Sequence, residues 1–256
     1  MEKNFATVIM AAGKGTRMKN SEKAKVMFEV AGKPMIQHVV DLAVALHSTR
    51  IIAVVGFYRE SVTTFVHRTS PSVEFAVQEP QLGTGHAVMQ AKNLLRDFRG
   101  DVLVLSGDVP LLREQTIREL ISVHHKKNAV ATILTADLED PSGYGRVLRG
   151  EADDVVGIVE HKDATDAQRK VREINSGIYI FDNEHLFDAL SHITAHNAQH
   201  EYYLTDVFGY YWEHGMKVAA KKAIDFNEVR GVNTVEQLEE ANEVLQKRNP
   251  VRIPVV

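Results

Sequence analysis

Short apolar runs alternate with helix-like segments along the first 105 residues, and this alternation restricts the possible folds more than any other feature. The apolar runs are expected to be strands and lie at residues 5–10, 50–56, 73–77 and 101–105. The segments between them are expected to be helices and lie at residues 35–47, 60–67 and 84–95. Strands and helices in alternation form βαβ units, in which the strands run parallel. We therefore predict an α/β fold, with a Rossmann-like, mostly parallel sheet and helices on both faces.

The rest of the chain has a more mixed pattern. Helices are expected at residues 113–126, 203–214 and 234–248, and strands at 129–136, 145–149, 155–160, 173–182 and 217–224. No linker rich in Pro, Gly or Ser separates this part from the first. We therefore expect a smaller, mixed lid that is built onto the same sheet, giving one domain over residues 1–249 and a tail at 250–256.

Composition excludes several classes of protein. The 256 residues are 44% hydrophobic and 25% charged, as is usual for a soluble globular domain. A net charge of −4 gives no sign of a nucleic-acid partner, and the absence of Cys excludes disulfides and thiolate catalysis. No apolar stretch approaches the roughly 20 residues that span a bilayer, so we expect a cytoplasmic protein with no membrane partner and no signal peptide. The 12 histidines lack metal-like spacing, and His124 and His125 are expected at a solvated helix end.

The loop at residues 11–18 follows the first expected strand and suits a phosphate group. Gly13 and Gly15 allow a ligand to approach the backbone, and successive N–H groups in such a turn can surround an anion. Arg17 and Lys25 add positive charge. The loop is not a P-loop, and it has a methionine where the dinucleotide-binding fingerprint needs a third Gly or Ala. A tight turn with solvated cations is the alternative.

Two further loops follow expected strands. In residues 78–87, Gln78 offers both a donor and an acceptor to the edge of a nucleobase, and Gly83 allows a planar ring to come close. In residues 106–111, Asp108 provides a carboxylate at a strand end, which suits Mg²⁺. Taken alone, the first could be a surface loop, and Asp108 could cap the next turn.

Together these loops resemble the signatures of the sugar-nucleotide pyrophosphorylases, nucleotidyltransferases that join a sugar 1-phosphate to a nucleoside triphosphate. The first loop is similar to the family's L-x-A-G-x-G-T-R-M segment, which binds nucleoside and triphosphate, and Lys25 fits the lysine that follows it. The second resembles the Q-x-x-x-L-G-T-G-H-A loop of the branch that makes UDP-N-acetylglucosamine, where the Gln and the Gly contact uracil. The third matches G-D-x-P-L, whose Asp binds the metal. Ala24 replaces the usual Pro, and Ser106 stands where some relatives have an aromatic residue.

The second half carries more segments that resemble the same family. Residues 143–146 are similar to G-Y-G-R, 158–164 to I-V-E-x-K-D-A, and 173–177 to E-I-N-[ST]-G, which contact the sugar in that family. Residues 202–206 match its E-Y-Y-x-T-D motif, and 231–233 its G-V-N motif, whose Asn is the second metal ligand. Each could otherwise be an ordinary turn or cap. The resemblance implies sugar-side residues Gly145, Glu160, Asn175, Tyr203 and Thr205, with Asn233 at the metal.

The resemblance covers about residues 5–245 and implies a uridylyltransferase with Mg²⁺ as its cofactor. Its small-molecule substrates would be UTP and N-acetylglucosamine 1-phosphate, and its products UDP-N-acetylglucosamine and pyrophosphate, formed by in-line attack on the α-phosphate. Arg17 and Lys25 would be catalytic, and Asp108 and Asn233 would bind the metal. The implied nucleotide-side residues are Ala11, Ala12, Gly13, Lys25, Gln78, Gly83 and Thr84.

The same resemblance divides the domain into a nucleotide-binding half at about 1–112, a sugar-binding lid at about 113–232 and a C-terminal helix at 234–248. In bifunctional members that helix leads into a left-handed β-helix acetyltransferase. The chain has no hexapeptide repeats, so we expect neither that domain nor acetyltransferase activity. The alternatives are a transferase for another base or sugar, such as N-acetylgalactosamine, and a nucleotide-sugar-binding protein without turnover. A Rossmann oxidoreductase is disfavoured, and the sequence makes no prediction of oligomeric state.

Overall fold

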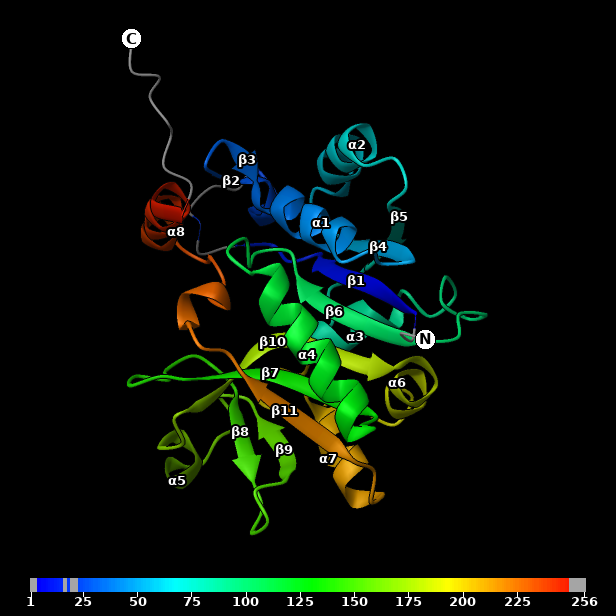
Figure 1. The fold of residues 1–256 in the computed structure, drawn as a ribbon, viewed down its shortest axis with the longest axis vertical. Helices are drawn as coiled ribbons and strands as arrows, with labels where there is room; N and C mark the ends of the chain where they lie inside the picture. Colours follow the sequence, from blue (N-terminus) through cyan, green and yellow to red (C-terminus); the bar gives the residue numbers. More distant parts are fainter. Residues whose placement is uncertain (1–3, 16–17, 19–22, 249–256) are drawn as a thin grey trace.

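The computed structural model describes residues 4–15, 18 and 23–248. Within these residues, a nine-stranded sheet has the strand order β11-β7-β10-β6-β1-β4-β5, with β8 paired to β10 and β9 paired to β8 (Figure 1). Its strands are β1 (Phe5–Ala11), β4 (Arg50–Val55), β5 (Glu74–Val77), β6 (Asp101–Ser106), β7 (Ala131–Asp137), β8 (Arg146–Arg149), β9 (Val155–Val159), β10 (Glu173–Asp182) and β11 (Val218–Lys222). A separate small hairpin pairs β2 (Glu29–Val30) with β3 (Lys33–Pro34).

The central part of the sheet is mostly parallel, and β10 and β9 run opposite to the other seven strands. Strands β6, β1, β4 and β5 run parallel to one another, and β7 runs parallel to β11. Strand β10 lies between β6 and β7 and is antiparallel to both. The strands of the second half therefore continue the sheet that the first half begins.

Helices cover both faces of the sheet, as the predicted α/β class requires. They are α1 (Met35–Ala45), α2 (Arg59–Thr69), α3 (Thr84–Met89), α4 (Glu114–Lys127), α5 (Asp166–Arg169), α6 (Asn183–Ala189), α7 (Asp206–Glu213) and α8 (Val235–Arg248), with 3-10 turns η2 (Lys25–Met27) and η3 (Phe226–Glu228). Side chains of α1, α2 and α4 pack in one apolar cluster, and those of α3, α6 and α7 pack in another. The confirmed fold is thus three-layered, with a helical layer on each side of the sheet.

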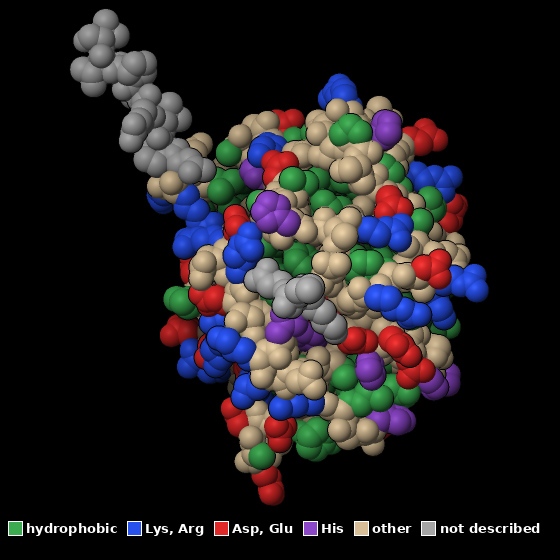
Figure 2. Space-filling view, turned by 45° about the vertical axis from the view of Figure 1, so that its right-hand side comes forward, with side chains coloured by type: hydrophobic (Ala, Val, Ile, Leu, Met, Phe, Trp, Pro, Cys, Tyr) green, Lys and Arg blue, Asp and Glu red, His purple; other side chains and the backbone are tan. Residues whose placement is uncertain are grey.

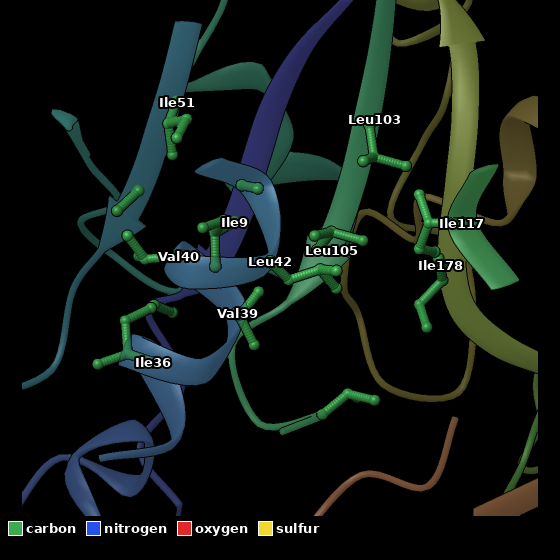
Figure 3. Packing of buried hydrophobic residues seen from close by; sticks show 14 of the residues in the cluster. Ile9, Ile36, Val39, Val40, Leu42, Ile51, Leu103, Leu105, Ile117 and Ile178 are labelled. Carbon is green, nitrogen blue, oxygen red and sulfur yellow. The ribbon is translucent and has the colours of Figure 1, made fainter. Parts of the chain in front are cut away.

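Successive strand residues point to opposite faces, so each strand contributes to both clusters. On β1, Ile9 packs with Ile36 of α1, whereas Val8 belongs to the cluster on the other face. Figure 3 shows Ile9, Leu105 and Ile117 in the first cluster. Burial on both faces explains why these strands are continuous apolar runs rather than alternating ones.

Helix α3 is shorter than the expected helix at 84–95, because it ends at Met89. The side chain of Gln90 donates from Nε2 to the carbonyl of His86 at 2.9 Å. A regular helix would use that carbonyl for the Gln90 backbone N–H, which instead bonds to Ala87 at 3.2 Å. The backbone hydrogen bonds thus change from the α-helical to the 3-10 pattern here, and the chain continues in turns to residue 97.

The expectation of a solvated pair at His124 and His125 was wrong. His124 is buried, and its Nδ1 lies 2.9 Å from the hydroxyl of Thr132. His125 Nε2 lies 2.8 Å from a carboxylate oxygen of Asp101, which begins β6 and is also buried. Both rings therefore satisfy polar groups beneath the end of α4, because a buried carboxylate and hydroxyl need partners.

The strand order creates a crevice at one edge of the sheet. From β1 the chain proceeds outward to β4 and β5, and it then returns to β6 on the other side of β1. In open α/β sheets, ligands bind outside the carboxyl ends of the strands at such a switch point. The loops after β1, β5 and β6 all lie at this edge, which positions a candidate site.

Other surface features are less distinctive. Figure 2 shows Lys and Arg side chains interspersed with Asp and Glu over the face in view. Among the described residues, no helix combines the length and the apolar character needed to cross a membrane.

Candidate functional site

A cavity of about 490 Å³ opens at the carboxyl ends of β1 and β6. The loops after β1, β5 and β6 form its walls, and all the predicted nucleotide-side residues lie among its lining. These are Ala11, Ala12, Gly13, Lys25, Gln78, Gly83 and Thr84, together with the predicted metal ligand Asp108. The structure therefore brings together three loops that are separated along the sequence.

Lys25 connects the two predicted metal ligands. Its ammonium donates to Asp108 Oδ2 in a short contact and to Asn233 Oδ1 at 3.0 Å. The backbone carbonyl of Asp108 accepts from the N–H of Val232 at 2.9 Å, which draws the segment before α8 against the loop after β6. Asp108 and Asn233, far apart in the sequence, consequently present their oxygens to one point.

Gly15 is required for the position of Lys25. Its φ of +62° lies in the left-handed region, and a Cβ atom there would lie 2.5 Å from the Cβ of Lys25. A larger residue would therefore displace η2, which carries the lysine. The other predicted catalytic residue, Arg17, lies outside the described residues.

The donor set around Lys25 suits a magnesium ion. Asp108 offers a carboxylate and Asn233 an amide oxygen, which are hard oxygen ligands of the type that Mg²⁺ prefers. The described part of the chain holds no group of three or more His, Asp or Glu residues arranged for a metal. A site with two protein ligands fits Mg²⁺, which is usually bound by one or two protein groups, substrate phosphates and water.

Gln78 is buried and is held by its own loop. Its Nε2 donates to the carbonyl of Gly83 at 2.9 Å and lies 3.2 Å from His86 Nδ1. Burial lowers the pKa of His86, which favours a neutral ring able to accept this hydrogen bond. Gln81 Nε2 also donates to the Gln78 carbonyl at 3.1 Å. In the described structure, Gln78 Oε1 has no hydrogen-bond partner, so the side chain retains an acceptor at the cavity.

The loop with Gln78 is attached to the segment that carries Tyr203 and Thr205. Gly83 has a φ of +107°, and a Cβ there would lie 2.6 Å from the carbonyl of Tyr202. The Thr84 hydroxyl accepts from the N–H of Leu204 at 3.0 Å. A nucleotide-side loop and a sugar-side motif are therefore joined directly.

Four of the predicted sugar-side residues form one cluster. The Thr205 hydroxyl donates to Glu160 Oε1 at 3.0 Å, and the N–H of Asn175 donates to the carbonyl of Gly145 at 2.9 Å. A Cβ on Gly145 would lie 3.3 Å from Glu160 Oε2 and 3.4 Å from Asn175 Cβ. Tyr203 lies beside them, but its hydroxyl donates to Asp163 at 3.2 Å.

Residues without an assigned role support this cluster. Asn175 Oδ1 accepts from the Tyr179 hydroxyl and from the N–H of Gly177, both at 2.9 Å, which fixes the amide. The Ser106 hydroxyl lies 3.4 Å from the Gly177 carbonyl and so links the cluster to the cavity. No sequence pattern pointed to Tyr179, whereas Asp163 stands within the segment 158–164 that resembles the family.

Two carboxyl groups at the cluster, those of Glu160 and Asp206, have raised pKa values. Burial raises the pKa of Glu160, and the Thr205 hydrogen bond opposes that shift. Burial, reinforced by the charges of Glu160 and Asp163, raises the pKa of Asp206 to about 6. This side of the site is acidic, which suits neutral sugar hydroxyls better than it suits phosphate.

Comparison with known proteins finds a matching family and close relatives in sequence. The model of the nucleotidyl transferase family matches residues 6–247. The chain is 48% identical over 248 residues to the bifunctional protein GlmU of Oceanobacillus iheyensis, covering 97% of this chain and 53% of that protein. It is 46% identical over 248 residues to the bifunctional protein GlmU of Enterococcus faecalis, with the same coverage. The chain thus spans about half the length of the curated relatives that it matches.

Two solved structures share the fold. A putative glucose-1-phosphate thymidylyltransferase from Bacillus anthracis, in complex with a sucrose, has a TM-score of 0.76 at 20% identity, with 94% of each chain covered. A UDP-glucose pyrophosphorylase complexed with UDP-glucose also has a TM-score of 0.76, at 18% identity, covering 96% of this chain and 99% of that one. At these identities the likeness extends to the fold alone.

Proposed function

Because the chain belongs to the nucleotidyl transferase family, we propose that it transfers a uridylyl group from UTP to N-acetylglucosamine 1-phosphate. The products are UDP-N-acetylglucosamine and pyrophosphate, the reaction of an N-acetylglucosamine-1-phosphate uridyltransferase. The motifs of the sequence and the similarity to the GlmU proteins support this choice of substrates. The cytoplasmic location expected from the sequence stays a prediction.

One observation carries the proposal. Lys25, Asp108 and Asn233 meet at a single point beside the cavity that Gly13 and Gln78 line. A protein that only binds a nucleotide sugar does not need a cation, a carboxylate and an amide oxygen at one point. A transferase needs such groups around the phosphorus that reacts, because phosphoryl-type transfer depends on positioning and charge stabilisation.

The nucleotide side positions the reacting phosphate. The backbone of the Gly13–Gly15 loop surrounds the triphosphate, and Gln78 with Gly83 contacts the uracil. Lys25 stabilises negative charge at the α-phosphate, and Arg17 holds the pyrophosphate that leaves. A phosphate oxygen of the sugar 1-phosphate attacks the α-phosphorus in line, so no nucleophilic side chain is required.

The sugar side orients the attacking group. Gly145 leaves room for the N-acetyl group, since a Cβ there would crowd Glu160 and Asn175. Glu160 accepts hydrogen bonds from sugar hydroxyls, and its Oε1 is already oriented by Thr205. Such positioning converts a bimolecular encounter into an effectively unimolecular step.

Asp108 and Asn233 would hold Mg²⁺, which supplies charge neutralisation and a template for the phosphates when it is bound. In the present structure both oxygens accept from Lys25. Triphosphate is a stronger partner for an ammonium group than a single carboxylate, so nucleotide binding would draw Lys25 toward the phosphates.

The test is pyrophosphate release from the four nucleoside triphosphates, each paired with a panel of sugar 1-phosphates that includes the N-acetylglucosamine and N-acetylgalactosamine compounds. We expect the highest kcat/KM with UTP and N-acetylglucosamine 1-phosphate, and loss of activity on adding a chelator. The Asp108→Asn protein, purified identically, gives the background. A higher kcat/KM with another base or sugar would favour a related transferase, and nucleotide-sugar binding without turnover would favour a binding protein.

A further inference from the structure

Arg146 is a buried cation that forms no ion pair with the other described residues. It begins β8, directly after Gly145, and only 1% of its surface is exposed. Of the described carboxylates, none lies within ion-pairing distance of its guanidinium, and its Nε has no hydrogen-bond partner. Burying a charge in this way is unfavourable and lowers the pKa of the group, and the charge of Asp140 only partly opposes that shift. A residue serving only to fill the core would be more stable as an apolar side chain.

The contacts of the guanidinium connect segments on either side of the sugar cluster, by which we mean Gly145, Glu160, Asn175 and Thr205. Its Nη1 donates to the carbonyl of Tyr144, which precedes Gly145. Its Nη2 donates to the carbonyl of Arg169 at 3.3 Å and lies 3.4 Å from His161 Nδ1. His161 directly follows Glu160. One side chain thus contacts the residue before Gly145 and the residue after Glu160.

The hydrogen bonds of the Arg146 guanidinium lie just beyond the end of the β8–β9 pairing. Strand β8 starts at Arg146, and β9 ends at Val159, which is its paired residue. Gly145 and Glu160 are therefore the first residues beyond the β8–β9 ladder, where hydrogen bonds between these two strands no longer fix their separation. A Cβ at Gly145 would lie 3.3 Å from Glu160 Oε2, so the two segments approach closely. The Arg146 guanidinium links the two segments beyond the last residue pair of β8 and β9.

We propose that Arg146 is a positioning residue for the sugar subsite, which holds the Gly145 loop and the Glu160 turn at the separation that the sugar 1-phosphate requires. It acts through these two segments and does not touch the substrate. The inference rests on the proposed function, because it assumes that the Gly145 and Glu160 cluster receives the sugar.

A guanidinium suits this role because its donors form a rigid, planar fork that reaches several acceptors at once. A lysine ammonium is a point charge on a flexible stem and would contact fewer of them. A methionine fills similar space with no donor. Lysine and then methionine at residue 146 therefore reduce stepwise the number of hydrogen bonds between the two segments. Both retain most of the side-chain volume of arginine.

The experiment compares R146M and R146K with the parent, using the sugar 1-phosphate that the parent prefers. KM for each substrate, kcat and the melting temperature are measured, together with calorimetric affinities for UTP and for the UDP-sugar product. We expect R146M to raise the sugar 1-phosphate KM by about 10–100-fold and to weaken product binding in parallel. The KM and affinity for UTP should change by less than about twofold. R146K should fall between R146M and the parent.

R169M is the matched control. The Arg169 side chain is on the surface, and only its backbone carbonyl, which the substitution keeps, accepts from Arg146. The control should behave as the parent. Equal KM changes for both substrates in folded R146M, or a sugar KM within twofold of the parent, would overturn the proposal.

If R146M does not fold, the same comparison of the sugar 1-phosphate KM with the UTP KM is made in R146K. Failure of both to fold would also overturn it, since the guanidinium would then serve stability alone. A parent inactive with every sugar 1-phosphate would refute the proposed function and this inference together, whereas an active parent with unchanged variants would refute only the inference.

Discussion

The ammonium of Lys25 lies where oxygens of Asp108 and Asn233 converge, so a metal ion bound as we propose would compete with this lysine for the same two ligands. Replacing Lys25 by methionine removes the competitor. Without nucleotide, we expect Lys25→Met to bind Mn²⁺ about fivefold more tightly, because a partly exposed ion pair is worth about 1 kcal/mol. Turnover should fall by about 10²–10³ as the charge at the α-phosphate is lost.

Electron paramagnetic resonance titration of Mn²⁺ gives the affinity directly. Lys33→Met is the matched control, since Lys33 is a partly exposed lysine paired with Asp41 at 2.7 Å, away from the cavity. Equal Mn²⁺ affinity in the parent and in Lys25→Met would show that the lysine contact does not compete with the metal.

Asp108 and Asn233 should act as a unit, because both oxygens face one point. Asp108→Asn removes the charged ligand and should lower turnover by about 10²–10³. Asn233→Ala should cost less and should be partly rescued by added Mg²⁺. The double variant should be much less impaired than the product of the two single effects. Steady-state rates across Mg²⁺ concentrations measure this.

The control for this series is Asp137→Asn, which removes an exposed carboxylate paired with Lys222. It should retain parent rates at every Mg²⁺ concentration. Near-parent turnover in folded Asp108→Asn, or strictly multiplicative effects in the double variant, would contradict a shared role for the two ligands.

Single-residue chemistry was predictable from the sequence only in part. The types of residue at Lys25, Asp108 and Gln78 indicated phosphate, metal and base contacts, because each follows a strand in a loop. Their convergence with Asn233 was not encoded in any local pattern and came from the family resemblance. The burial of Arg146 was also unpredictable, since a strand residue flanked by apolar positions gives no sign of which carbonyls surround it.

At the scale of elements, the order of strands and helices in the first half follows from burial. A strand covered on both faces forms a continuous apolar run, as residues 102–105 of β6 do, and its pattern is then distinct from that of an amphipathic helix. The direction of β10 was not predictable in this way, because a buried strand has the same composition whether it runs parallel or antiparallel. The missed helix α6 had a usable signal, since Asp182 accepts from the N–H groups of Glu184 and His185 as an N-cap.

Helix α7 should contribute a pH dependence to stability. Its first residue, Asp206, has a pKa raised from 3.8 to about 6 by burial and then by the charges of Glu160 and Asp163. The folded state therefore binds the proton more tightly than the unfolded state, and stability declines as the pH rises from about 4 to about 6. The shift corresponds to about 3 kcal/mol at most. The helix N-terminus opposes it by less than about 1 kcal/mol.

Asp206→Asn should remove this decline and raise the free energy of unfolding at pH 8 by about 1–3 kcal/mol, with a smaller gain at pH 5. Urea denaturation at both pH values measures the difference. Asp166→Asn, which removes an exposed carboxylate from the first turn of α5, is the matched control. A gain of equal size at pH 5 and pH 8 would contradict the assignment to Asp206 ionisation.

At the scale of the whole molecule, one sheet carries both halves of the site. The nucleotide loops follow β1, β5 and β6, whereas the sugar cluster is built on β8, β9 and β10. Strand β10 pairs with β6, and Ser106 at the end of β6 lies 3.4 Å from the Gly177 carbonyl. A ligand that spans the site therefore stabilises two parts of one continuous structure. The match of the nucleotidyl transferase family to residues 6–247 confirms that the resemblance covers both parts.

A bridging ligand should consequently stabilise the fold more than a nucleotide alone. At 100 times its Kd, UDP-N-acetylglucosamine contributes about 2.7 kcal/mol, which raises the melting temperature by about 5–10 °C in a domain of this size. We expect a smaller rise with UDP at the same concentration. Differential scanning fluorimetry of the parent with each ligand measures the two rises and the difference between them.

Glycine variants attribute that difference to the sugar cluster. Gly145→Ala places a methyl group 3.3 Å from Glu160 Oε2, in the space that we propose for the N-acetyl group, so it should abolish the extra rise from the sugar and keep the rise from UDP. Gly157→Ala lies on the neighbouring strand, where a Cβ would meet nothing within 4 Å, and it should behave as the parent. Gln78→Ala should reduce both rises, because both ligands share the base. If Gly145→Ala kept the full difference between the two ligands, the sugar would lie elsewhere than in the Gly145 and Glu160 cluster.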